Sequence, residues 1–269
     1  GEGSYVWSVT ATDTAGNVAV LDLDSVPAGD QAVKLQIDTT PPTFVTPQIG
    51  LTGEYWDAAT RNVKLNKTTS VSVQFSEALD GTTVDKTDFT VAGATPIDAF
   101  WTADTKNVAT IANYVFLTVP ALAPDAKPSV VMVGAIKDKA GNPMVPNVTA
   151  TLKDGIAPTL TAALDKTLTK DKVILTIVSN EALGAVPTVP LEAENPAGAA
   201  VTAIAVPAGA NQWTWTYTPG VNGSYVVKVA GTDTSAIAGT LGVSRCTVLA
   251  AGVCTANPDY ATKGIAFEV

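Results

Sequence analysis

Alternation of apolar and polar residues with a period of two is the feature that most limits what this chain can fold into. In residues 5–12, the odd positions are apolar or aromatic and positions 8, 10 and 12 are polar. The same rhythm runs through 71–75 and through 213–217, where it places Trp213, Trp215 and Tyr217 on one strand face. Turn residues recur about every 8–12 positions and helical periodicity is nearly absent, so the pattern predicts β-sandwiches.

Internal repeats indicate that several such units follow one another. GSYV occurs at 3–6 and again at 223–226, and DTAGN at 13–17 recurs as DKAGN at 138–142. Two proline-containing segments, DTTPPT at 38–43 and DGIAPT at 154–159, begin 116 residues apart, which is the length of one sandwich domain. Proline cannot continue a central strand, so these segments are predicted to be short, stiff linkers.

The repeats set the expected domain boundaries. Residues 42–156 and 157–269 are each predicted to be a complete sandwich. Residues 1–41 hold only the last strands of an incomplete unit, expected near 3–12, 17–23 and 32–38, followed by a linker. The end of the chain, 264–269, parallels 32–37. The surplus length of the last unit falls around Cys246 and Cys254, so that segment is predicted to be an insertion between two strands, closed by one disulfide. The alternative is two buried thiols in a reducing compartment.

The composition excludes several classes of function. Lys plus Arg is 16 and Asp plus Glu is 25, which gives a net charge of −9. The chain has no histidine, so it cannot form a Ser-His-Asp or Cys-His nucleophile or a His-ligated metal site. Two cysteines cannot complete a four-ligand zinc or iron–sulfur site. An acidic chain also lacks the cations that neutralise nucleic-acid phosphates, so no nucleic-acid partner is expected.

Other features concern the compartment. No run of apolar residues approaches the roughly 18 that a membrane-spanning helix needs. The chain opens on Gly-Glu-Gly without an apolar signal core, which is typical of a mature form or a fragment. Little lysine, abundant threonine and an acidic balance favour an extracellular or cell-surface protein.

The middle unit resembles bacterial immunoglobulin-like domains, which are repeated in S-layer proteins and adhesins. The residues that carry the resemblance are the opening PPT at 41–43, VQFSEAL at 73–79, DFTV at 88–91, LAP at 122–124 and IKDKAGNP at 136–143. The last unit keeps SNEAL at 179–183 but has DTSA at 233–236 in place of the glycine-containing turn. The resemblance implies tandem immunoglobulin-like β-sandwiches, an exported location and a role as a spacer or lattice module; it does not supply a ligand.

Acidic residues at the turns and linkers form the candidate metal sites. Carboxylate, amide and carbonyl oxygens are the ligands that calcium takes, and a loop Asp with a linker Asp could converge between neighbouring domains. The other interpretation is turn chemistry, in which Asp and Asn cap their own turns and Gly16 or Gly141 supplies the positive φ. Glu77 and Glu181, which recur after a strand, are interpreted as structural turn residues. The predicted calcium ligands are Asp13, Asn17, Asp38, Asp138, Asn142 and Asp154.

The function expected from the sequence is non-enzymatic: a structural cell-surface protein, such as an S-layer, an extracellular filament or an adhesin stalk. Its expected partners are copies of itself, in a lattice or filament, with strand exchange through residues 1–38 as one route. The alternative is a carbohydrate-binding or spacer region of a secreted polysaccharide-active enzyme. That alternative needs an exposed aromatic platform, for which Trp213 and Trp215 are the candidates, although an aromatic stripe in a sandwich is usually the core face.

Overall fold

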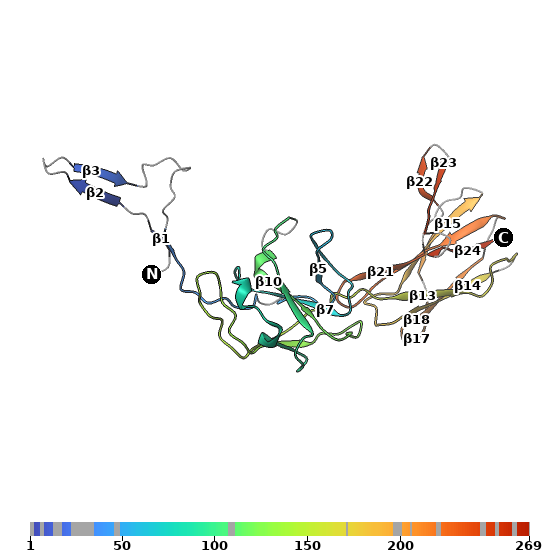
Figure 1. Ribbon diagram of the computed structural model, residues 1–269. Helices are drawn as coiled ribbons and strands as arrows, with labels where there is room; N and C mark the ends of the chain where they lie inside the picture. Colours follow the sequence, from blue (N-terminus) through green and yellow to red (C-terminus); the bar gives the residue numbers. More distant parts are fainter. Residues whose placement is uncertain are drawn as a thin grey trace.

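The computed structural model is an all-β chain built of antiparallel sheets, as the sequence predicts. Its three parts follow one another along the molecule, in the order of the sequence (Figure 1). The structure describes the chain except for residues 1–2, 6–7, 13–17, 23–34, 46–48, 107–110, 171, 196–200, 205, 219–221, 243–245, 251–252, 260–262 and 269. Among the described residues, no helix has both the length and the apolar character that crossing a membrane requires.

The N-terminal part contains two antiparallel strand pairs. β1 (Gly3–Tyr5) pairs with β4 (Leu35–Ile37), and β2 (Ser8–Thr12) pairs with β3 (Val18–Asp22). The alternation across 5–12 is therefore divided between two strands that have different partners.

The middle part packs two three-stranded sheets around one core. β7 (Ser70–Gln74), β10 (Tyr114–Thr118) and β9 (Asp98–Trp101) form one sheet. β12 (Val148–Thr151), β11 (Ser129–Met132) and β8 (Phe89–Val91) form the other. Both sheets contribute to a single cluster of buried apolar side chains drawn from residues 44–152. A hairpin of β5 (Tyr55–Asp57) and β6 (Asn62–Lys64), with the 3-10 helices η2 (Gly81–Thr83), η3 (Lys86–Asp88) and η4 (Ile111–Asn113), completes the part.

One face of β7 departs from simple alternation, because Ser70 and Ser72 are buried as well as Val71 and Val73. Residues 49–53 cover this strand, and the amide of Ser72 donates to the carbonyl of Leu51 over 2.9 Å. The Ser72 hydroxyl donates to the carboxylate of Glu54, so the buried polar group has a partner. Gly50 lies so close that a Cβ there would stand 2.0 Å from the carbonyl oxygen of Ser72.

The C-terminal part has its own core between a four-stranded and a six-stranded sheet. The first sheet has the order β13 (Leu160–Leu164), β14 (Val173–Ser179), β18 (Gln212–Tyr217) and β17 (Val206–Gly209). The second has the order β21 (Ala238–Leu241), β20 (Val229–Thr232), β15 (Thr188–Asn195), β19 (Ser224–Val227) and β24 (Ile265–Glu268), with β16 (Val201–Ile204) also paired to β15. Buried apolar residues of 160–267 from both sheets form one cluster.

Strand register confirms the repeat between the two ends of the chain. Tyr5 opposes Leu35 in the N-terminal part, and Tyr225 opposes Phe267 at the corresponding positions of β19 and β24. β2 pairs with β3 in the same register as β20 pairs with β21. Residues 3–37 therefore repeat the strand pairing of the last unit, as the recurrence of Gly-Ser-Tyr-Val predicts.

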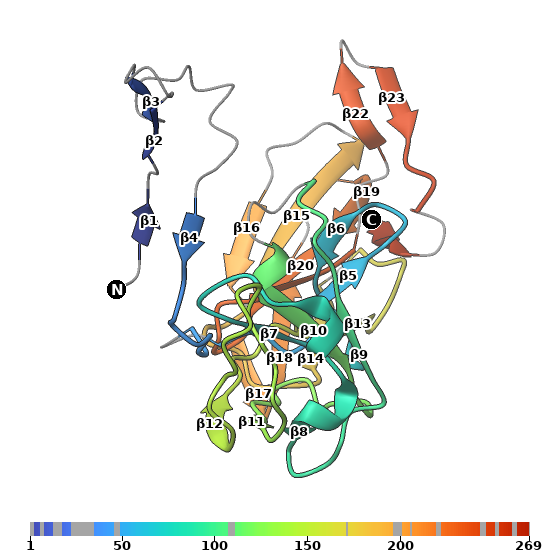
Figure 2. The ribbon, with the colours of Figure 1, turned by 60° about the vertical axis from the view of Figure 1, so that its left-hand side comes forward.

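The cysteine segment lies between two strands of the large sheet, as predicted. It forms a hairpin of β22 (Cys246–Ala250) and β23 (Val253–Ala256), which projects away from that sheet in both views (Figures 1 and 2). The backbone register opposes Cys246 to Ala256 and Cys254 to Leu249. The side chains of the two cysteines lie outside the described residues, so the disulfide stays a prediction.

Candidate functional site: carboxylates at the two linkers

Two groups of three carboxylates occupy equivalent places at the two linkers. In the first triad, Asp38, Glu77 and Asp138 bring one carboxylate oxygen each to within 4.8 Å of the others. In the second triad, the residues are Asp154, Glu181 and Asp233, within the same distance. Each triad takes one residue from the linker, one from the turn after a core strand, and one from a late turn.

The linkers dock by the same hydrogen bonds in both units. The amide of Thr43 donates to the Ser76 hydroxyl over 3.0 Å, and the amide of Ser76 donates back to the Thr43 carbonyl over 2.8 Å. At the second linker the amide of Thr159 donates to Oδ1 of Asn180 over 2.7 Å, and the amide of Asn180 donates to the Thr159 carbonyl over 3.2 Å. This docking carries Glu77 and Glu181, one residue further on, to the linker carboxylate of each junction.

The late turns at 138–142 and 233–237 also match, although the sequence of the second lacks the glycine. Oδ1 of Asp138 accepts from the amide of Asn142 over 2.8 Å, and Oδ1 of Asp233 accepts from the amide of Ile237 over 2.8 Å. The φ angle is +94° at Gly141 and +69° at Ala236. Ala236 therefore adopts the left-handed conformation that glycine supplies in the first turn, and the turn survives the loss of the glycine.

The two turns differ in how the second carboxylate oxygen of the Asp is satisfied. The side-chain amide of Asn142 donates to Oδ2 of Asp138 over 2.7 Å and to the main-chain carbonyl of Asp38 over 3.0 Å. Ile237 occupies the matching position in the second turn and has no donor in its side chain. Oδ2 of Asp233 and Oε1 of Glu181 are buried and have no hydrogen-bond partner among the residues that the structure describes.

The second triad is deeply buried and strongly acidic. The exposed fractions are 3% for Asp154, 4% for Glu181 and 3% for Asp233. Burial first, and then the nearby charges of Asp154, Asp233 and Asp125, raise the pKa of Glu181 to about 7, while the charge of Lys127 acts in the opposite direction. Burial is also the main reason that the pKa of Asp154 is raised. No ion pair among the described residues neutralises the three carboxylates.

The linker residue of the second triad is also held by the preceding unit. Oδ1 of Asp154 accepts from the amide of Ile156 over 2.9 Å and from the Thr52 hydroxyl over 3.4 Å. The amide of Gly155 donates to the Thr52 hydroxyl over 3.1 Å, and the amide of Ala157 donates to Oδ1 of Asn66 over 2.7 Å. Asp154 is therefore fixed by the middle unit while its carboxylate meets Glu181 and Asp233 of the last unit.

The predicted calcium ligands separate into three outcomes. Asp38, Asp138 and Asn142 come together at the first linker, as an Asp of the linker meeting a loop of the next unit. Asp154 joins the second triad, away from that group. Asp13 and Asn17 lie outside the described residues.

Sequence reasoning missed Glu77, Glu181 and Asp233 as members of these sites. The signal was present, because an Asp in the linker, a Glu-Ala-Leu after a strand and an Asp in a late turn each occur once per unit. Because Glu77 and Glu181 are interpreted from the sequence as structural turn residues, they are not included among the predicted calcium ligands.

The aromatic stripe of β18 belongs to the core. Trp213 is 8% exposed and Trp215 is 3% exposed, and Trp215 stacks on Tyr217 with ring centroids 5.4 Å apart. The interpretation as core is confirmed, and the interpretation of this face as a platform for sugar rings is wrong. The alternative role as a spacer region of a polysaccharide-active enzyme does not depend on that platform and stays untested.

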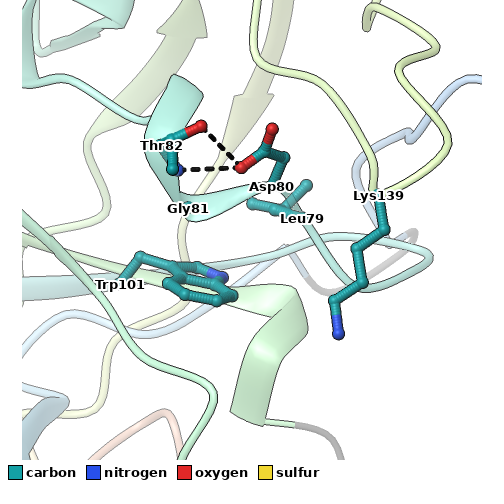
Figure 3. Close-up of a pocket in the computed structure, with 6 residues that line it drawn as sticks. All are labelled: Leu79, Asp80, Gly81, Thr82, Trp101 and Lys139. Carbon is teal, nitrogen blue, oxygen red and sulfur yellow. Dashed lines mark hydrogen bonds between the residues drawn. The ribbon is translucent and has the colours of Figure 1, made fainter.

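Two shallow pockets lie near the first linker. One, of about 380 Å³, is lined by Asp38 and Glu77 of the first triad together with Ala78, Lys139 and Ala140. The other, of about 500 Å³, lies between Trp101 and η2 (Figure 3). In the pocket between Trp101 and η2, the carboxylate of Asp80 is turned toward Thr82, whose amide and hydroxyl both donate to it. These bonds lower the pKa of Asp80 and make it the cap of η2.

Comparison with known proteins gives structural likeness only. No protein family matches the sequence, and no curated protein matches it. Similar solved structures include a pullulanase complexed with maltotriose from Anoxybacillus sp. LM18-11, with 13% identity and a TM-score of 0.27 over 73% of this chain. They also include the N-terminal part of the bacterial S-layer protein SbsC (16% identity, TM-score 0.28, 65% of this chain) and the D00-D0 domain of intimin (16%, 0.29, 74%).

The chain spans only 27% of the pullulanase and 40% of the S-layer structure, but 96% of the intimin structure. TM-scores this low do not assign the chain to a known fold. The strand pairing of the chain itself therefore defines its fold.

Proposed function

We propose that the chain is a structural, non-enzymatic segment of a cell-surface protein, built of tandem immunoglobulin-like sandwiches that act as a spacer or assemble into a lattice, filament or stalk. The observation that carries the proposal is that the same junction is built twice. Reciprocal hydrogen bonds join Thr43 to Ser76 at one linker and Thr159 to Asn180 at the other, and a carboxylate triad accompanies each.

A junction of this kind limits how far neighbouring units can turn. The second linker is bonded to the middle unit through Thr52 and Asn66 and to the last unit through Asn180, so both of its ends are fixed. Pro158 restricts the backbone in between, as Pro41 and Pro42 do at the first linker. Repetition of sandwiches joined in this way gives length and stiffness, which are the properties that a spacer or lattice module needs.

The composition supports the extracellular location, because a chain with few lysines, abundant threonine and net charge −9 is typical of exported surface proteins. The resemblance of the middle unit to the repeated domains of S-layer proteins and adhesins supports the same role.

Small-angle X-ray scattering of the whole chain tests this proposal. We expect the distance distribution of an elongated particle with two end-to-end units and a narrow range of inter-unit angles. The matched control is a variant with a short Gly-Ser segment inserted after Ala157, which should widen that range while both units stay folded. A compact distribution for the wild type, or one that the insertion does not change, would contradict the proposal.

A further inference from the structure

The second triad has the properties of a cation site. Three carboxylates within 4.8 Å of one another repel strongly in a buried environment, and no cationic side chain among the described residues is paired with them. A buried polar atom without a partner is rare in folded proteins and calls for an explanation such as an ion. Here two such atoms, Oε1 of Glu181 and Oδ2 of Asp233, belong to the same cluster.

Comparison with the first triad shows that the missing partner is specific to the second. At the first linker, the side-chain amide of Asn142 occupies the space beside Oδ2 of Asp138 and donates to it. The replacement by Ile237 removes that donor but keeps the turn, the buried carboxylate and the approach of the linker Asp. The second site therefore keeps the acceptors and lacks the internal donor, which is what an external cation requires.

From this geometry we infer that Asp154, Glu181 and Asp233 bind one calcium ion at the junction between the middle and last units. Calcium takes oxygen ligands at about 2.3–2.6 Å and accommodates irregular geometry. Two ligands on opposite sides of such an ion lie about 5 Å apart, which matches carboxylate oxygens gathered within 4.8 Å. Three carboxylates that no cationic side chain pairs with among the described residues favour a divalent cation in this buried position.

The ion locks the junction, because its ligands come from both sides of it. Asp154 is held by Thr52 of the middle unit, whereas Glu181 and Asp233 belong to turns of the last unit. Binding therefore ties the orientation of one sandwich to that of the next. This mechanical consequence rests on the structural role proposed above, while the site itself does not.

The competing occupant is a proton. A proton held by Glu181 would reduce the charge of the cluster without any metal. The two cases differ in the response to calcium, since a cluster that only takes up protons gains nothing from the ion, whereas a cation site binds it with release of protons.

Isothermal titration calorimetry and thermal unfolding of the whole chain, freed of metal with a chelator and then titrated with CaCl2 at neutral pH, test the inference. We expect saturable binding and a rise in Tm on the order of 10 °C at a Ca²⁺ concentration about a hundredfold above Kd. MgCl2 is the second probe, because Mg²⁺ demands a more regular shell and dehydrates reluctantly. Absence of both heat and Tm shift for the wild type overturns the inference, and an equal response to Mg²⁺ overturns the assignment to calcium.

Variants locate the site. Glu181→Gln and Asp233→Asn should each bind one equivalent of Ca²⁺ fewer than the wild type. The matched control is Asp98→Asn, which removes the same charge from an exposed strand residue whose carboxylate accepts from the neighbouring amide of Ala99. Fluorescence of the buried Trp213 and Trp215 shows whether each variant is folded. Full binding by both folded variants overturns the inference, whatever the scattering experiment shows about the stiffness of the chain.

Discussion

Exchanging alanine and glycine between the two late turns tests whether those turns are structural equivalents. Ala236 has a φ of +69° and Gly141 a φ of +94°. A left-handed conformation costs a residue with a Cβ about 1–2 kcal/mol. Replacing glycine by alanine recovers about 0.4–1 kcal/mol through the entropy of the unfolded chain. The difference predicts that Gly141→Ala destabilises the middle unit by about 0.5–1 kcal/mol and that Ala236→Gly stabilises the last unit by a similar amount.

The structure excludes a steric contribution at the first position, since a Cβ on Gly141 would meet no atom within 4 Å. The expected loss therefore comes from backbone strain alone. At the second position the carbonyl of Asp233 accepts from the amide of Ala236 in the turn, and this bond does not involve the side chain. Glycine can keep it, so relief of strain is the main effect of the substitution.

Urea unfolding in the presence of a chelator measures both changes, with tryptophan fluorescence as the signal. Each unit has its own core, so two transitions are expected, and each substitution should move one of them. With an m-value of about 1.5 kcal/mol/M, the midpoints should move by about 0.3–0.7 M, downward for Gly141→Ala and upward for Ala236→Gly. Shifts in the same direction, or a lower midpoint for Ala236→Gly, would refute the equivalence of the turns.

Two further predictions concern the middle unit. Phe75→Ala should destabilise it by about 3–5 kcal/mol, because this ring is fully buried. Phe100→Ala, at a ring that is 43% exposed, is the control and should cost much less in the same urea titration. Burial raises the pKa of Glu54 from 4.5, so its favourable contribution is complete below that pH and is lost as pH rises through the higher folded-state value. Glu54→Gln should therefore gain Tm relative to the wild type as the pH rises above the ordinary pKa of 4.5, and a constant difference would contradict the assignment.

Much of the fold follows from the sequence because strand structure has a local signature. A period of two fixes which side chains share a face, so the burial of Trp213 and Trp215 in the last core follows from their spacing. Proline-containing linkers 116 residues apart mark the unit length without any knowledge of tertiary contacts. The recurrence of Gly-Ser-Tyr-Val predicts the register of β19 with β24 from that of β1 with β4.

The acidic sites depend on contacts that no local pattern specifies. Asp154, Glu181 and Asp233 are far apart in the sequence, and only the docking of the linker through Thr159 and Asn180 brings them within 4.8 Å. The sequence alone determined the repeated units, their strand rhythm and the excess of acidic residues. The tertiary structure decided which carboxylates meet. It left one triad with an internal donor and the other without, because one position of the repeated turn is Asn142 in the middle unit and Ile237 in the last unit.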